Sequence, residues 1–355
     1  MIHDRVLTLD PPSVRRLETK YVWDGNQSKV KMAAPMTGHA RFCARSFKKV
    51  LLGRHLNGCQ KLVKRQCRSA STDNSQYCLD LVGLVFKRKS DHESFLSALL
   101  LPQSARASVI ALRAFNVETA SVNESVSEKH IGLMRMQFWK DVLTRIYEGA
   151  PTQQPVAMEL YRAVHRHKLS KRWLTRILEA RVETLDAKPY QSVEELEAYA
   201  ESTSSSLLYL TLEALGVKDV NADHAASHIG KAQGIVTLLR ATPYHISKRQ
   251  VLLPMDVTIK HNVSHETILQ RNAEQPLKDV IYDIASAAHV HLETARSFKA
   301  SVPREALPAF LVTGSVEAYL RRLQKVNFDI FHKNCMKKES LLPLLLWLQN
   351  KRKKY

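Results

Sequence analysis

Two segments of the chain carry residues suited to chemistry on a charged substrate. They are 113–120 and 239–254, and their spacing of apolar residues predicts largely helical structure. Each contains an arginine, Arg113 or Arg240, that suits an anion. Carboxylates four residues apart, on each of two facing helices, would hold magnesium ions, which prefer oxygen ligands. Such ions would neutralise a diphosphate leaving group. The two segments contain one acid, Glu118.

The elements that must position these segments are predicted to be helices. The 355 residues include only 11 Gly and 13 Pro, and 45% are hydrophobic, which favours a helical fold with a substantial core. No alternating β-pattern, internal repeat or linker divides the body, so we expect one all-α domain. The expected helices cover 74–88, 91–101, 102–122, 127–148, 154–167, 171–185, 192–215, 223–240, 266–271, 277–299, 304–326 and 341–351.

Local signals specify several of these helices. Ser192 and Glu195 form a capping box at the start of 192–215. Gly149 is a stop signal, and Pro243 is expected to end 223–240 because its ring removes a helical hydrogen bond. Two sets of residues are expected to face inward, the first at 3,4 spacing and the second at intervals of four. They are Leu112, Phe115, Thr119 and Val122 in the first set, and Met134, Phe138, Val142 and Ile146 in the second.

Residues 77–350 resemble the squalene and phytoene synthase family. The resemblance is carried by segment 113–120, by Arg-Met-Gln-Phe-Trp at 135–139, and by 230–254. It implies an isoprenoid synthase-like helical bundle around a central cavity, in which two facing helices each carry an Asp-rich motif that binds magnesium and diphosphate. The motif positions correspond here to Asn116, Ala120, Ala241 and His245, none of which is acidic. Glu118 cannot replace them, because two residues turn a helix by about 200°.

The resemblance therefore implies a frame without its metal site. Arg113 and Arg240 remain as residual anion contacts, and no metal or other cofactor is expected. The residues of these motifs are more similar to those of a non-enzymatic branch of the family. This similarity implies a role in assembling mitochondrial complex I (NADH dehydrogenase). Its partners would be complex I subunits or other assembly factors, with a lipid in the central cavity as a further option. The alternatives are a residual prenyl-diphosphate transferase with an altered metal site and a peripheral lipid-binding module.

The formal net charge of +19 is concentrated near the start of the chain. Residues 32–72 contain nine Lys or Arg and no acid, in an amphipathic pattern typical of a mitochondrial transit peptide. The alternative is a basic tail that binds nucleic acid or anionic lipid. We expect residues 1–31 to be an upstream extension that does not contain the native start, and 73–355 to be the synthase-like domain. The transit peptide predicts a mitochondrial location, and the resemblance implies a matrix protein associated with the inner membrane.

Three further features are secondary candidates. His224 and His228 have the i, i+4 spacing of a zinc site, although histidines on a helix surface are the commoner explanation. A basic run from Arg162 to Arg176 and the tail 351–354 would suit anionic lipid or a partner surface. We expect no nucleic acid partner, because the aromatic residues of the basic run fit core positions.

Overall fold

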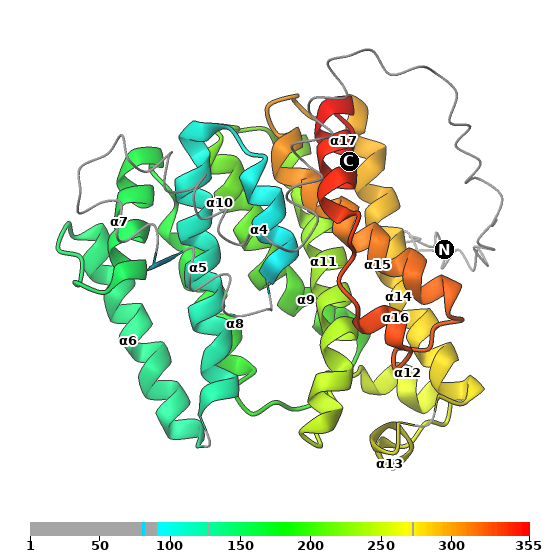
Figure 1. The fold of residues 1–355 in the computed structure, drawn as a ribbon. Coiled ribbons are helices and arrows are strands. Elements are labelled where there is room, and N and C mark those ends of the chain that lie inside the picture. Colours follow the sequence, from blue (N-terminus) through cyan, green and yellow to red (C-terminus); the bar gives the residue numbers. More distant parts are fainter. Residues whose placement is uncertain (1–79, 82–90, 127, 272) are drawn as a thin grey trace, which may run out of the picture. The chain divides into compact units, whose positions relative to one another are not determined.

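The computed structural model describes residues 80–81, 91–126, 128–271 and 273–355, which lie within one compact unit, Lys49–Tyr355. Every regular element in these ranges is a helix, so the all-α prediction is confirmed (Figure 1). The predicted extension 1–31, the predicted transit peptide 32–72 and most of the helix expected at 74–88 lie outside the described residues. The expected domain boundaries remain predictions.

The first helices of the unit share one apolar core. They are α4 (His92–Leu99), α5 (Gln103–Ser125), α6 (Lys129–Tyr147), α7 (Pro155–His167) and α8 (Lys171–Glu183). The predicted inward set on α5, which includes Phe115, is buried. Phe115 meets Trp139 of α6 edge to face, with the ring centroids 5.4 Å apart. Gly149 has a positive φ of 83° just beyond α6, as the stop signal predicts.

The second part of the unit is built around the long helix α11. The elements are α9 (Val193–Ala200), the π-helix η2 (Glu201–Ser205), α10 (Ser206–Ala214), α11 (Val220–Ser247), α12 (Met255–Lys260), α13 (His265–Leu269), α14 (Gln275–Ser297), the 3-10 turns η3 (Phe298–Ala300) and η4 (Leu307–Val312), α15 (Thr313–Lys325), α16 (Lys333–Met336) and α17 (Leu342–Arg352). The Ser192 hydroxyl accepts a hydrogen bond from the Glu195 amide at 3.3 Å, which confirms this cap.

Two glycines let α11 approach η2 and α9 closely. A Cβ added at Gly230 would lie 2.5 Å from the Cα of Ser205, and one added at Gly234 would lie 3.1 Å from the Cα of Ala200. The first distance is shorter than real contacts allow. Because the Ser205 backbone, and not only its mobile side chain, stands in the way at Gly230, this position requires glycine.

The predicted orientation of α6 is partly wrong. Val142 and Ile146 are buried, but Met134 is 69% exposed and Phe138 is 47% exposed. The first three turns bury Gly132, Met136 and Trp139 instead. Both sets of residues follow helical spacing, so periodicity alone could not decide which one faces the core.

Two predicted helix boundaries are also wrong. Helix α11 continues through Pro243 to Ser247. Thr242 and Ile246 are buried on either side of the proline, and their packing offsets the backbone bond that its ring removes. The single helix expected over 304–326 begins instead as the 3-10 turn η4 and becomes α-helical only at Thr313.

Candidate functional site

The four positions predicted from the family motif lie on two helices. Asn116 and Ala120 are on α5, and Ala241 and His245 are on α11. Ala120 is exposed and the other three are partly buried. The α4 helix links the two motif helices through contacts with both, and Figure 1 shows it between them.

Both arginines near these positions pair with acids of the chain itself. Arg113 is buried, and its Nη1 lies 3.9 Å from Oδ2 of Asp91, the residue that precedes α4. The Nη1 of Arg240 donates a hydrogen bond to Oε2 of Glu93 in the first turn of α4. Two arginines from different helices therefore converge on one acidic turn, close to the helix N-terminus that already favours negative charge. The predicted residual anion contacts are thus occupied by internal carboxylates.

The Asn116 side chain has a cationic partner. Its Oδ1 accepts a hydrogen bond of 2.5 Å from Nη2 of Arg181 on α8. Arg181 is buried, and its Nε has no hydrogen-bond partner. Burial lowers the pKa of the Arg181 guanidinium, because a charge is costly away from water. A cation therefore touches the position where the family motif requires a metal-binding acid, and this repels a metal ion.

The remaining positions also lack metal ligands of the required kind. Ala120 and Ala241 have no side-chain donor atom. His245 has a buried Nδ1 without a hydrogen-bond partner. Burial lowers the pKa of His245, although the neighbouring Gln250 and the Glu124 charge oppose this effect. Imidazole nitrogen suits softer metals than magnesium.

Glu124 is the functional candidate that the sequence analysis missed. It lies one helical turn beyond Ala120 on α5, and its charge acts on both His245 and Lys248 of α11. The Glu124 charge is therefore within electrostatic range of the second motif helix. The spacing from Ala120 was the available signal, since residues four apart share a helix face. One exposed carboxylate does not make a magnesium site.

The two histidines considered for zinc, His224 and His228, both stack on the Phe298 ring. His224 stacks on Phe298, with the ring centroids 5.9 Å apart. His228 places its Nδ1 2.9 Å from Nδ1 of His291 on α14. The Nε2 of His291 lies 3.1 Å from Oε1 of Glu197. Within the described ranges, no cluster of three or more His, Cys, Asp or Glu residues has an arrangement that could hold a metal ion.

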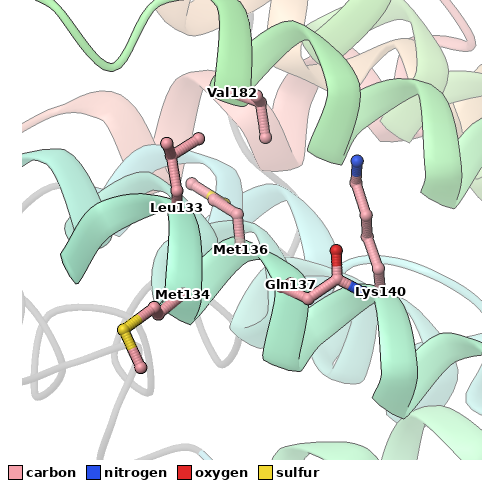
Figure 2. A pocket seen from close by; sticks show the side chains of 6 residues that line it. All are labelled: Leu133, Met134, Met136, Gln137, Lys140 and Val182. Carbon is pink, nitrogen blue, oxygen red and sulfur yellow. The ribbon is translucent and has the colours of Figure 1, made fainter. Parts of the chain in front are cut away.

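A pocket of about 300 Å³ opens on the surface of α6. It is lined by Leu133, Met134, Met136, Gln137, Lys140 and Val182. Figure 2 shows Val182 of α8 pointing toward Leu133 and Met136, while Met134 points away from Val182. None of the four motif positions lines this pocket. The central cavity implied by the family remains a prediction.

The chain belongs to the squalene/phytoene synthase family, whose sequence model matches residues 87–341. The fold agrees with this assignment. A dehydrosqualene synthase is similar with a TM-score of 0.68 and 17% identity, over 78% of this chain and 97% of that one. A squalene synthase of Alicyclobacillus acidocaldarius has a TM-score of 0.65 and 16% identity, over 74% and 98%. The isoprenoid synthase fold is thereby confirmed.

Within this family the chain is similar to proteins called NADH dehydrogenase (ubiquinone) complex I, assembly factor 6. The rat protein is 59% identical over 82% of this chain and 88% of its own length. The human protein is 60% identical over 79% and 82%. The homolog from Drosophila melanogaster is 40% identical over 83% and 90%.

Proposed function

We propose that this protein is a mitochondrial assembly factor for respiratory complex I, and that it is a non-enzymatic member of its family. The names of its relatives support the assembly role. On this proposal it works in the matrix, in peripheral contact with the inner membrane, and its partners are complex I subunits or other assembly factors. No helix among the described residues is long and apolar enough to cross a membrane.

One observation carries the non-enzymatic part of the proposal. The side chain at the first motif position, Asn116, is bonded to Arg181 rather than offering an acid to a metal. Arg113 and Arg240 are paired with Asp91 and Glu93. Ionisation of an allylic diphosphate needs metal ions that neutralise the departing charge. Two arginines of this site are already paired with internal acids, and no carboxylate stands at a motif position. The site therefore lacks the ligands that would hold these metal ions.

The catalytic alternative has a direct test. Purified full-length protein is incubated with magnesium and farnesyl or geranylgeranyl diphosphate, and prenyl products and released diphosphate are measured. We expect neither product above the background without protein. Magnesium-dependent turnover would overturn the non-enzymatic proposal and support a residual transferase with relocated metal ligands.

The assembly role has a separate test in cells. Depletion of the protein should lower the amount of assembled complex I, and re-expression of the intact chain should restore it. The variant Arg181→Met tests whether the former site contributes to assembly. If the protein acts only through its surface contacts, this variant should restore complex I to the same level as the intact chain does. Normal complex I after complete depletion would contradict the assembly role.

The α6 surface is the protein-contact site that fits this role best. Met134 and Lys140 line the pocket, Met134 is 69% exposed, and Phe138 on the same helix is 47% exposed. Exposed apolar residues around a concave site are typical of docking surfaces, and flexible methionines adapt to a partner. The chemistry fits an amphipathic helix of a partner protein that inserts an apolar side chain beside the pocket and presents an acid to Lys140.

A pair of matched substitutions tests this surface. Phe138→Asp should abolish restoration of complex I, because it places a charge in the apolar contact. Val290→Asp on α14, where the side chain is 46% exposed, is the control and should restore complex I fully. Both proteins should unfold within about 0.5 kcal/mol of the intact chain, because the substitutions are on the surface. Equal rescue by both variants would exclude α6 as the contact surface.

A further inference from the structure

The last helix, α17, has two apolar faces. Leu342 and Leu346 are buried and pack against Leu311, and Leu96 and Leu100 of the α4 region join this cluster. Helix α17 also contacts α15 and η4, so it is firmly attached to the unit (Figure 1). One apolar face is therefore sufficient to hold α17 on the fold.

The second apolar face is open to solvent. Leu341, Leu344 and Leu345 are 56%, 37% and 43% exposed, and Leu348 is partly exposed. At 100° per residue these four side chains fall within an arc of about 100°. A contiguous exposed leucine cluster is unusual on a helix whose other face already packs on a core, and it indicates a contact site. We call these four residues the leucine face.

Basic side chains continue the leucine face at its C-terminal end. Lys351 and Arg352 follow one turn after Leu348, and both are exposed. The ammonium of Lys351 lies 5.3 Å from the centre of the half-exposed Trp347 ring. The charge is nearly all of one sign, since residues 333–355 contain seven Lys or Arg and a single acid, Glu339.

The single acid does not offset this charge at the leucine face. The Oε2 of Glu339 lies 3.9 Å from Nε of Arg322 on α15, so a base outside residues 333–355 balances it. The combination of exposed leucines, a neighbouring tryptophan and uncompensated bases is the composition of helices that lie at the surface of an anionic membrane.

We propose that the leucine face docks on an anionic phospholipid bilayer. The four leucines enter the boundary between headgroups and acyl chains, while Lys351 and Arg352 extend to the lipid phosphates. This inference rests on the proposed function, which places the protein in contact with the inner membrane, and it assigns that contact to one surface. A bilayer fits better than a protein partner, because lysines are depleted from protein interfaces and three of the four bases at 351–354 are lysines.

The test uses full-length protein and vesicle flotation. Vesicles of phosphatidylcholine with cardiolipin are compared with vesicles of phosphatidylcholine alone. We expect binding to the anionic vesicles only, weakened by added salt. The double variant Lys351→Gln/Arg352→Gln should bind about 25-fold less, since each base contributes about fivefold. The double variant Leu344→Asn/Leu345→Asn should lose at least about tenfold.

The control is Ile259→Asn on α12, which Figure 1 shows at the opposite end of the unit from α17. Ile259 is 66% exposed, so a general loss of surface hydrophobicity would affect it equally. We expect this variant to bind like the intact chain. Equal binding by the leucine variant and the intact chain, or equal losses in the leucine variant and the control, would overturn the inference.

The outcomes separate the inference from the proposed function. Vesicle flotation needs no complex I, whereas depletion and rescue need no vesicles. Unchanged flotation of the leucine and base variants refutes the leucine face even if depletion lowers complex I. Selective loss of flotation supports the leucine face even if complex I is normal after depletion, and in that case only the assembly role fails.

Discussion

The pairing between Arg240 and Glu93 makes a quantitative prediction about the region of the family motif positions. The substitution Glu93→Gln keeps the shape of the side chain and removes the negative charge of the carboxylate, which accepts a hydrogen bond from Arg240. The two side chains are only 29% and 20% exposed. The positively charged guanidinium of Arg240 would then be largely shielded from water and would have no carboxylate partner.

The magnitude follows from this intermediate burial. Exposed ion pairs contribute about 0.2–1 kcal/mol, and removing one partner of a buried pair costs about 3–5 kcal/mol. A pair that keeps about a quarter of its exposure lies between these limits after allowance for solvent screening. We expect Glu93→Gln to lower the free energy of unfolding by about 1–2 kcal/mol, measured by urea denaturation.

A double-mutant cycle isolates the pair. Glu93→Gln, Arg240→Gln and the double variant should give a coupling of about 1 kcal/mol. The control cycle is Lys260 with Asp283, where the lysine is 66% exposed, and its coupling should be smaller. A coupling near zero for Glu93 and Arg240 would refute the idea that an internal acid holds this arginine.

The same variant predicts a change in ligand response. Inorganic diphosphate without magnesium should raise the melting temperature of Glu93→Gln more than that of the intact chain, because Arg240 is freed to bind it. An identical response in both proteins would mean that Glu93 does not block access to this arginine.

Three other predictions concern the helices around this site. Gly230→Ala should lower the free energy of unfolding in urea by about 2–3 kcal/mol, because the new Cβ would meet backbone atoms. Gly314→Ala is the control and should cost clearly less, because its Cβ would first meet the movable end of a side chain. Equal losses in the two variants would contradict the close approach of α11 and η2. Asn116→Asp should add about 1 kcal/mol of stability, because Arg181 would donate a charge-assisted hydrogen bond to the new carboxylate. Magnesium should not stabilise this variant further. Stabilisation by magnesium would show that the metal displaces this arginine. Burial lowers the pKa of His228 below its ordinary 6.5. The unfolded chain therefore binds the proton more readily than the folded chain, and the stability of the fold decreases as the pH drops below 6.5. The difference between the melting temperatures at about pH 7 and pH 5 should be smaller for His228→Gln than for the intact chain.

The parts of the fold that the sequence predicted correctly depend on local signals. The buried set on α5 and the Ser192 cap are specified by residues three and four positions apart, and both are confirmed. On α6, by contrast, two sets of residues have helical spacing, and only tertiary packing, in which Trp139 meets Phe115 of α5, determines that Trp139 is buried while Met134 is exposed. Pro243 shows the same limit, because tertiary packing overrides a local stop signal.

The charge pairs of the candidate site were not predictable from local signals. The Arg240–Glu93 pair joins residues 147 positions apart, and Arg181 reaches Asn116 across 65. Arg113 and Arg240 were expected to be available to an anion, because local spacing does not place Asp91 and Glu93 beside them. The positions without acids are identified by the family resemblance, but the cation beside Asn116 follows only from the packing of α8 against α5.

These contacts explain how the frame can be stable without metal or diphosphate. A cluster of arginines around an empty anion site would repel one another and lose hydration on burial. Here Asp91 balances Arg113 and Glu93 balances Arg240, while Asn116 gives Arg181 one strong acceptor. The helices that would surround a substrate are thus held by their own side chains. On the proposed function, binding free energy then has to come from outside the former site, where the exposed apolar residues of α6 and α17 are available to a partner protein and to a membrane.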